Sequence, residues 1–466
     1  MDAVVGHGAR THSGLLRFLA TSLVVPLLLT ACVNVSSSPA PTATSAPTAT
    51  SSVAPSDSPT EAPTATAAPT ETPTPTPTAT AKATPKASPR PGQWTGVKWT
   101  ALGTIPQLYH ANSDAPDTYS IVNVYGWSHG YVGFQTIVTA DSRTGTGSMV
   151  STSSADAVTW TPDLAMPASG IDYPLSVTDV LEGPTGLLAI GRITGMACGG
   201  PSTVSAMWTS SDGVTWSRVT PPADFAAASV YTVDGGSSGY IATGILKDGL
   251  TQALWVSTDG RTWNSKLLPK SVFGQVIVQG GTSFAGGFVI SGAIRGDEGC
   301  GGYRYQTPSL WWSADGAAWS RATLTGTAPS TDSTMSVTRV NDHTLMAIAN
   351  EWNAATQTSS TRVWATSDGR TWRLAATPSS MLGSNIRTDG LQGLAILDNN
   401  VDPAQTQLPL TIAAVGDDLS VRVLPQTGAV PTAAQSPVAW DSSIGPSGLV
   451  VLSADASVLW LGAPLR

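Results

Sequence analysis

Charged side chains are scarce in this chain of 466 residues: Asp, Glu, Lys and Arg together make up 12%, and the formal net charge is −8. A protein that binds nucleic-acid phosphates needs a concentration of Lys and Arg, so no nucleic-acid partner is predicted. The low charge also argues against coiled coils and helical bundles. Only five His and three Cys occur, and the histidines lack the spacing of metal ligands. We therefore expect neither a metal nor another cofactor.

Glycine, proline and tryptophan are abundant instead, with 46, 34 and 16 copies. Gly and Pro favour tight turns, and Trp is enriched in strands. The composition therefore predicts an all-β fold.

The first 31 residues are typical of a bacterial secretory signal. Two arginines precede an apolar run from Phe18 to Leu29, and Leu29-Thr30-Ala31-Cys32 follows it. This ending resembles a lipobox, in which the cysteine thiol receives a diacylglycerol. The run is shorter than the roughly 18 to 20 residues that span a bilayer and contains a proline, which argues against a transmembrane helix. We expect Cys32 to anchor the mature chain on the extracytoplasmic side of a bacterial cell membrane.

Residues 32–93 contain the lipidated cysteine and a segment made almost wholly of Ser, Thr, Pro and Ala. Such a segment cannot bury enough apolar surface to offset the entropy of ordering, so it predicts a disordered linker. The folded domain is predicted to cover residues 94–466.

Five similar segments, here called boxes, recur within 94–466. Four carry Asp-Gly with a Trp three positions after the Gly, and the weakest has Ala157 in place of Gly. Their key residues are Asp156 with Trp160, Asp212 with Trp216, Asp259 with Trp263, Asp315 with Trp319, and Asp368 with Trp372. Each box predicts a strand, a tight turn and a returning strand, because Gly tolerates positive φ and the carboxylate accepts unpaired backbone N–H groups. Residues that recur once per repeat form the fold, so their predicted role is structural.

A second repeat places a glycine before an apolar strand. Its copies begin at Gly130, Gly186, Gly239, Gly287, Gly393 and Gly448, with Thr344 in one place. Seven copies at a period of roughly fifty residues predict a seven-bladed β-propeller, with six or eight blades as alternatives. The segment around Trp99 is half a box and that around Trp460 is a strand with no box after it. We therefore predict that the N-terminal strand pairs with the C-terminal strands and closes the ring.

The boxes resemble the Asp-box, or BNR, repeats of sialidase-like propellers. The resemblance implies that they lie between the third and fourth strands, on the face opposite the usual active site. It does not imply an activity, because such repeats occur in hydrolases, receptors and assembly factors alike. The Arg-Ile-Pro motif and arginine triad of sialidases are not seen. Acid/base candidates for a glycosidase are Asp172, Asp297, Glu298 and Glu351.

Candidate ligand contacts occur in loops predicted on the other face. They are Tyr109, Tyr173, Arg192, Arg295, Tyr303, Arg304, Tyr305 and Trp352. Aromatic rings beside polar groups suit sugar or protein contacts, and the alternative is that they pack their own loops. Arg192 and Arg295 either present a cationic pair to a carboxylate or form local salt bridges.

Cys198 and Cys300 occupy matching loops two blades apart. In an oxidising compartment this predicts a disulfide, with two free thiols as the alternative.

Taken together, the sequence favours a monomeric, membrane-anchored lipoprotein that presents a propeller as a binding or assembly module for a protein or glycan. It predicts no enzyme. The alternatives are an exo-acting, sialidase-like glycoside hydrolase and a chaperone-like propeller similar to photosystem assembly factors.

Overall fold

The computed structural model divides the chain into two compact units, Arg17–Thr84 in one and Met1–Leu16 with Pro85–Arg466 in the other. All described residues belong to the second unit. They are residues 94–105, 118–139, 148–168, 175–193, 204, 206–248, 251–268, 270–273, 276–295, 305–330, 333–353, 358–375, 384–388, 393–399, 411–418, 420–431, 441–453 and 457–465. The predicted signal, Cys32 and the predicted linker lie outside this part, as do Cys198 and Cys300.

The described residues form seven sheets and two short helices, which confirms an all-β fold. The first sheet holds β2 (Thr118–Trp127), β3 (Gly130–Thr139), β4 (Ser148–Ser154) and β5 (Leu164–Ala165). The second holds β6 (Leu175–Gly183), β7 (Gly186–Ile193), β8 (Ala206–Ser210) and β9 (Ser217–Val219). The third holds β10 (Ser229–Gly236), β11 (Gly239–Ile245), β12 (Gln252–Ser257) and β13 (Asn264–Leu267). The fourth holds β14 (Val276–Phe284), β15 (Gly287–Arg295), β16 (Tyr305–Ser313) and β17 (Ser320–Arg321).

The remaining sheets depart from this simple pattern. The fifth holds β19 (Thr334–Asn341), β20 (Thr344–Asn353), β21 (Thr358–Thr366), β22 (Thr371–Leu374) and β18 (Thr323–Thr325). The sixth holds β23 (Ser384–Thr388), β24 (Leu394–Asn399), β25 (Thr411–Val415) and β26 (Val421–Val423). The seventh holds β28 (Asp441–Gly445), β29 (Gly448–Leu452), β30 (Leu459–Leu465), β1 (Gly96–Gly103) and β27 (Gln426–Gly428).

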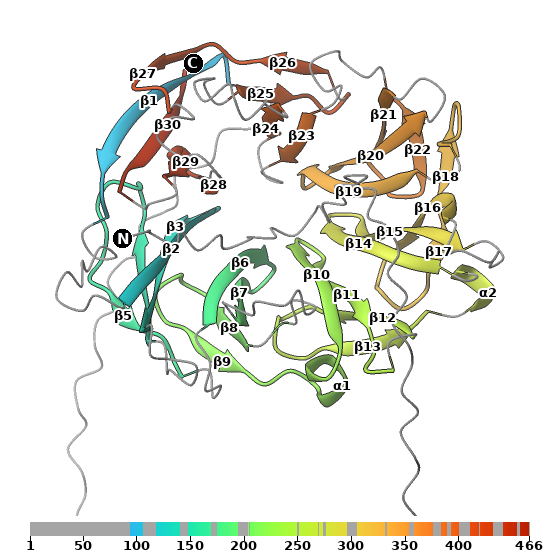
Figure 1. The fold of residues 1–466 in the computed structure, drawn as a ribbon, viewed down its shortest axis with the longest axis horizontal. Helices are drawn as coiled ribbons and strands as arrows, with labels where there is room; N and C mark the ends of the chain where they lie inside the picture. The colour runs from blue at the N-terminus through green and yellow to red at the C-terminus, as the bar shows by residue number, and fades with distance from the viewer. Residues whose placement is uncertain are drawn as a thin grey trace, which may run out of the picture. The chain divides into compact units, whose positions relative to one another are not determined.

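Each sheet follows its neighbour around a common centre (Figure 1), with its first strand innermost. Innermost strands contact one another: β2 contacts β28 and β6, β10 contacts β6 and β14, and β19 contacts β14 and β23. Leu394 and Ile412 of the sixth sheet share a hydrophobic core with Trp99 and Leu449 of the seventh. Most of the core therefore lies between sheets, where the two apolar faces exclude water from each other.

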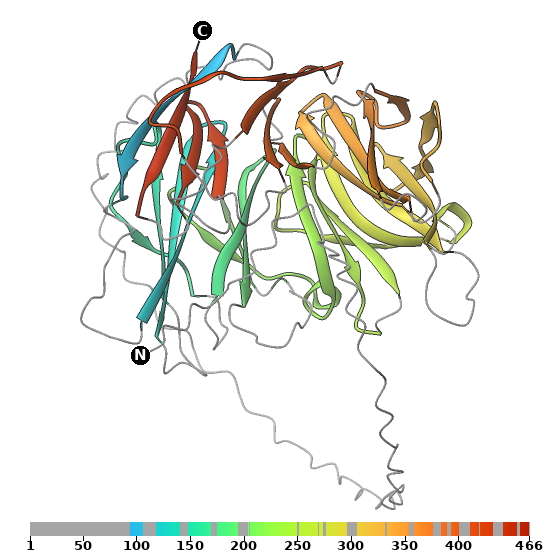
Figure 2. The same ribbon diagram turned by 45° about the horizontal axis from the view of Figure 1, so that its top comes forward.

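The first described strand pairs with the last one. β1 is antiparallel to β30, with Trp99 opposite Gly462 and Ala101 opposite Trp460, and the strands run side by side in both ribbon views (Figures 1 and 2). Trp99 Nε1 also donates a hydrogen bond to Gln426 Oε1 at 2.7 Å. The segments that the sequence analysis placed together, around Trp99 and Trp460, thus share one sheet.

Two outer edges carry an additional parallel strand that the repeats did not predict. β18 is parallel to β22, and β27 is parallel to β1. Both follow directly after the fourth strand of the preceding sheet, β17 and β26 respectively. The chain therefore covers the next sheet's open edge as it leaves its own, which satisfies edge N–H and C=O groups.

Close approach of the backbone explains the glycine at the start of most second strands. Gly186 has φ +123°, and a Cβ there would lie 2.3 Å from Ser210 O. Gly287 has φ +118°, and its Cβ would lie 2.2 Å from Ser313 O. The end of the third strand therefore occupies the space that a side chain would need. Thr344, which replaces glycine in the fifth sheet, instead donates to Asp417 Oδ1 at 3.1 Å.

Two one-turn helices precede β10 and β14, and the sequence analysis missed both. They are α1 (Ala223–Ala226) and α2 (Lys270–Phe273). Phe225 lies 5.1 Å from Trp255, and Phe273 lies 5.2 Å from Trp311, measured between ring centroids. Each helix thus inserts one aromatic ring against a third-strand tryptophan.

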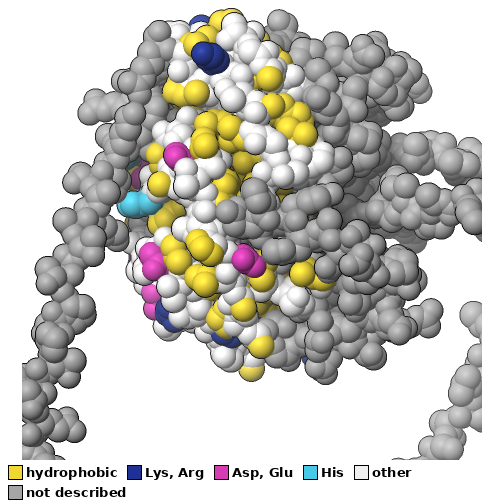
Figure 3. Space-filling view, turned by 90° about the vertical axis from the view of Figure 1, so that its left-hand side faces the viewer, with side chains coloured by type: hydrophobic (Ala, Val, Ile, Leu, Met, Phe, Trp, Pro, Cys, Tyr) yellow, Lys and Arg dark blue, Asp and Glu magenta, His cyan; other side chains and the backbone are white. Residues whose placement is uncertain are grey.

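The outer surface mixes apolar and uncharged polar side chains. On the side shown in Figure 3, charged groups are few and hydrophobic ones are spread among polar atoms. Large exposed hydrophobic residues include Leu164, Leu267, Leu374 and Val423, each on a different fourth strand. Such isolated residues are normal on a soluble surface and do not define a docking patch.

Candidate functional site

The five boxes occupy the turns between third and fourth strands of the first five sheets. In the third sheet, Asp259 Oδ1 accepts the backbone N–H groups of Arg261 at 2.8 Å and Thr262 at 2.7 Å. Ser257 Oγ donates to the same oxygen at 3.0 Å and accepts from Gly260 N at 2.8 Å. Asp156, Asp212, Asp315 and Asp368 make the corresponding two backbone contacts in their own turns. The carboxylates therefore hold turns in shape.

Hydrogen bonding sets the charge state of the box aspartates. Partial burial raises the pKa of Asp259, but the N–H donors of Thr262 and Arg261 outweigh it and leave the pKa below its ordinary value. The almost unburied Asp315 has its pKa lowered mainly by the N–H groups of Ala318 and Ala317. A carboxylate held ionised in this way is poorly suited to act as a general acid at neutral pH.

The box tryptophans close the turns from the apolar side. Trp160, Trp263, Trp319 and Trp372 each donate an indole N–H to the carbonyl three residues earlier, at 2.9 to 3.2 Å. The earlier residue has φ between +66° and +71° in all four boxes. In the weakest box this residue is Ala157, which is strained there because its Cβ opposes positive φ.

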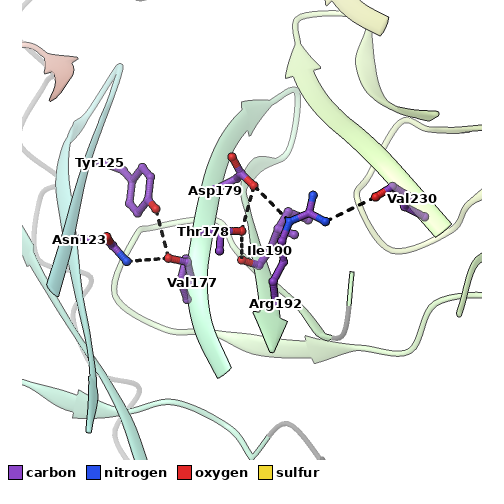
Figure 4. Close-up of polar contacts among 8 residues, drawn as sticks. All are labelled: Asn123, Tyr125, Val177, Thr178, Asp179, Ile190, Arg192 and Val230. Carbon is purple, nitrogen blue, oxygen red and sulfur yellow. Dashed lines mark hydrogen bonds and ion pairs between the residues drawn. The ribbon is translucent and has the colours of Figure 1, made fainter. Parts of the chain in front are cut away.

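A polar network joins the innermost strands of the first three sheets (Figure 4). Asn123 Nδ2 and Tyr125 Oη on β2 both donate to Val177 O on β6, at 2.7 and 3.2 Å. The register of β6 shifts between Val177 and Asp179. An irregularity of this kind disturbs ladder pairing, and here the neighbouring sheet supplies donors to Val177 O. β10 and β14 carry similar shifts.

Arg192 takes part in this network. Its Nε lies 3.8 Å from Asp179 Oδ2, with the two side chains 7% and 4% exposed. Its Nη1 donates to Val230 O at 3.4 Å on the third sheet (Figure 4). Burial lowers the pKa of Arg192, and the nearby Asp179 carboxylate opposes that effect. Of the two alternatives for Arg192, these contacts agree with the local salt bridge.

The carboxylate of Glu351, one of the glycosidase candidates, is also bound by other groups of the protein. It is 7% exposed on β20. Its Oε1 accepts from Ser330 N at 2.9 Å, and its Oε2 lies 3.1 Å from Arg362 Nη2. Arg362 Nη1 in turn donates to Ala328 O at 2.8 Å. Glu351 therefore holds the segment before β19 against β20 and β21.

A cluster that the sequence analysis missed lies at the hairpin between β2 and β3. Ser128 Oγ donates to Glu182 Oε1 and lies 2.6 Å from His129 Nδ1, and Ser128 N donates to Glu182 Oε2 at 2.9 Å. In a hydrolytic triad the carboxylate orients the histidine, which then takes the serine proton. Here the carboxylate contacts the serine itself, so the cluster has the composition of a triad without its geometry.

The other candidate ligand contacts are only partly described. Tyr109, Tyr173, Tyr303 and Arg304 lie outside the described residues, as do Asp172, Asp297 and Glu298. Arg295, Tyr305 and Trp352 are described only in their backbones. Tyr305 is opposite Arg295, and Trp352 is opposite Ser359, so all three continue strand pairs. The predicted placement of Tyr305 and Trp352 in loops is therefore wrong. The paired strands continue beyond their apolar residues.

Within the described ranges, no helix is long and apolar enough to cross a membrane. In the same part of the chain, no three His, Cys, Asp or Glu side chains are grouped to hold a metal ion.

No family model matches the chain, and no curated protein matches it. Solved structures do. The β-propeller domain of the Trilobed protease from Pyrococcus furiosus is 8% identical, with 76% of this chain and 96% of that chain covered and a TM-score of 0.41. The intramolecular trans-sialidase from Ruminococcus gnavus is 11% identical over 78% and 99% of the two chains, with a TM-score of 0.34. A six-bladed lectin from Aleuria aurantia is 10% identical over 67% and 97%, with a TM-score of 0.30. These values assign no activity to the chain.

Proposed function

We propose that this protein is a lipid-anchored, extracytoplasmic binding module, in which the seven sheets are the blades of a closed β-propeller. The observation that supports the binding role is that, among the described residues, the carboxylates considered for catalysis are bound to other groups of the protein. Asp179 contacts Arg192, Glu351 contacts Arg362 and Ser330, and the box aspartates hold their turns. A two-carboxylate glycosidase needs an acid and a base that are available to substrate.

Turnover by the full chain tests the binding role against the hydrolase alternative. We expect no release of fluorophore from a panel of fluorogenic sialosides, galactosides and fucosides. Release that persists in Glu351→Gln would point to other catalytic residues, and release that this substitution abolishes would make Glu351 catalytic. Either result would contradict the proposal.

Ring closure is supported by the β1 and β30 pairing and by contacts between the sixth and seventh sheets. Arg422 Nη2, on β26 of the sixth sheet, donates to Trp94 O at 2.5 Å. Thr100 lies opposite Leu461, so cysteines introduced at both positions should form a disulfide in the folded full chain. Peptide mapping after non-reducing digestion would locate the bond. Absence of the bond in folded protein would contradict closure by the two terminal strands.

The anchor is supported by the Leu-Thr-Ala-Cys sequence and the linker-like composition after it. Detergent phase partitioning of the chain expressed in a lipoprotein-processing bacterium tests it directly. The wild-type chain should enter the detergent phase, and Cys32→Ser should remain in the aqueous phase. Cys198→Ser is the matched control and should partition as wild type does. Equal partitioning of wild type and Cys32→Ser would contradict the anchor.

A further inference from the structure

A polar cavity lies between the boxes of the second and third sheets. Its volume is about 340 Å³, and its lining includes six Ser and Thr residues, among them Thr209 and Thr215. Asp259 and Arg261 of the third sheet's box complete the lining. The volume falls at the small end of the range, on the order of 300 to 1,000 Å³, in which ligand pockets occur.

The corresponding positions between later sheets are filled by apolar side chains. The residue before the box is Val256 in the third sheet, and its Cγ2 would lie 2.7 Å from a Cβ on Gly316. In the fourth sheet it is Trp312, whose Cδ1 would lie 2.2 Å from a Cβ on Gly369. Arg370 stacks over this indole, with its Cζ 3.9 Å from the ring centroid. The second sheet has the smaller, polar Thr209 at this position.

Thr209, one of the residues that line the cavity, carries a buried hydroxyl. The residue is 6% exposed, and its Oγ1 has no hydrogen-bond partner within the described structure. Burying a hydroxyl without a partner is unfavourable, and such groups in native proteins usually face water or a ligand. Thr209 lines the cavity, but its Oγ1 is itself shielded from solvent, so a bound group reaches this hydroxyl only after the side chain rotates about χ1 and exchanges Oγ1 with Cγ2.

We propose that this cavity, here also called the open groove, binds a neutral polyhydroxylated ring, such as a pyranose sugar. Ser and Thr hydroxyls both donate and accept, which suits sugar hydroxyls that do the same. Asp259 Oδ2 accepts one described hydrogen bond, from Thr262 Oγ1 at 3.2 Å, and a carboxylate oxygen can accept two. Arg261 adds a donor beside this acceptor. Asp259 and Arg261 carry opposite charges, so the lining has no net charge that would favour an anion such as phosphate over a neutral ring.

The inference goes beyond the proposed function, because the groove depends neither on the lipid anchor nor on the predicted loop contacts. It is tested by titrating the full chain with methyl glycosides of glucose, galactose, mannose, fucose and N-acetylglucosamine, and with inorganic phosphate. Calorimetry or saturation-transfer NMR would follow binding. We expect at least one glycoside to bind in preference to phosphate.

Three variants locate the site. Thr209→Val keeps the side-chain shape and should weaken glycoside binding about tenfold by removing a hydrogen bond. Arg261→Gln should weaken it by a similar factor. Arg370→Gln, at the matching place in the filled groove, should bind like wild type. Thr209→Val should also retain the wild-type Tm, because it removes a hydroxyl that has no protein partner.

Each result of these binding experiments either supports or overturns the proposal. Loss of binding in the first two variants, with Arg370→Gln unchanged, supports the proposal. Binding that Thr209→Val and Arg261→Gln both leave intact overturns it, as does stronger binding of phosphate. Failure to bind any glycoside at millimolar concentration also overturns it. Such a failure leaves the lipid anchor and the ring closure unaffected, because separate experiments test them.

Discussion

Two grooves between neighbouring sheets have the same turn but differ in the side chains that occupy them. We call the groove between the fourth and fifth sheets the filled groove, and the one between the second and third sheets the open groove. Between the fourth and fifth sheets, Trp312 and Phe284 press against Gly369, and Arg370 covers the indole. Between the second and third sheets, the nearest atom to a Cβ on Gly260 would be Thr209 Cγ2 at 3.3 Å. The turns themselves are alike, and in these two grooves the residue before the box differs, Thr209 in one and Trp312 in the other.

Removing the indole from the filled groove should have the largest effect. Trp312→Ala is expected to lower the free energy of unfolding by about 3 kcal/mol, because it leaves a cavity beside Phe284 and removes the surface on which Arg370 stacks. Thr209→Ala removes few contacts and should cost less than about 1 kcal/mol. Urea unfolding of the two variants measures both values. Equal losses would show that the grooves do not differ in packing.

Alanine in place of the turn glycine should separate the grooves next. Gly369 and Gly260 have φ +71° and +69°, so alanine at either costs about 1 kcal/mol in backbone strain. Gly369→Ala must also displace Trp312 and should cost about 1 kcal/mol more. Thermal unfolding of both variants gives the comparison. A larger loss in Gly260→Ala than in Gly369→Ala would contradict the account of the filled groove.

The box carboxylates should contribute equally in the two grooves. Asp259→Asn and Asp368→Asn are each expected to cost about 1 kcal/mol at pH 7, because a charge-assisted contact to two N–H groups becomes a neutral one. In the folded chain the pKa of each aspartate lies below its ordinary value, because backbone N–H groups donate to the carboxylate. Their stabilisation is therefore fully present above the unfolded pKa and is lost as pH falls through the lower folded pKa.

Unfolding curves at pH 7 and at successively lower pH check the sign. The difference between wild type and each variant should shrink on acidification. A difference that grows below pH 4 would mean that the carboxylates are destabilised by folding, against the hydrogen bonds that they accept.

The smallest expected difference concerns the two arginines. Arg370→Gln should lower the free energy of unfolding by about 0.5 to 1 kcal/mol, because its guanidinium stacks on Trp312. Arg261→Gln should change it by less, since no described indole lies beneath it. Chemical denaturation of the two variants resolves this difference if the free energy of unfolding depends equally steeply on denaturant concentration in both. A greater cost at Arg261 would place an aromatic partner in the open groove.

The sequence predicted the repeats because they recur along the chain. Asp-Gly-x-x-Trp marked four turns and Asp156-Ala157 a fifth, and Trp460 marked the strand that pairs with β1. It missed contacts that depend on the neighbouring sheet, such as β18 beside β22 and Asn123 beside Val177. The groove was missed for the same reason: Thr209, Val256 and Trp312 are visible before their boxes, but only packing across two sheets shows that one leaves space. Tyr305 and Trp352 were misplaced because polar residues can extend a ladder.

Grafting the indole into the open groove tests most directly whether that groove is truly unfilled. The experiment is a double-mutant cycle of Thr209→Trp with Arg261→Gln, measured by urea unfolding of the full chain. The account predicts that Thr209→Trp folds with stability equal to or above wild type, and that Arg261 then couples to the new ring by about 0.5 to 1 kcal/mol. A loss above about 2 kcal/mol in Thr209→Trp, with no coupling, would contradict it.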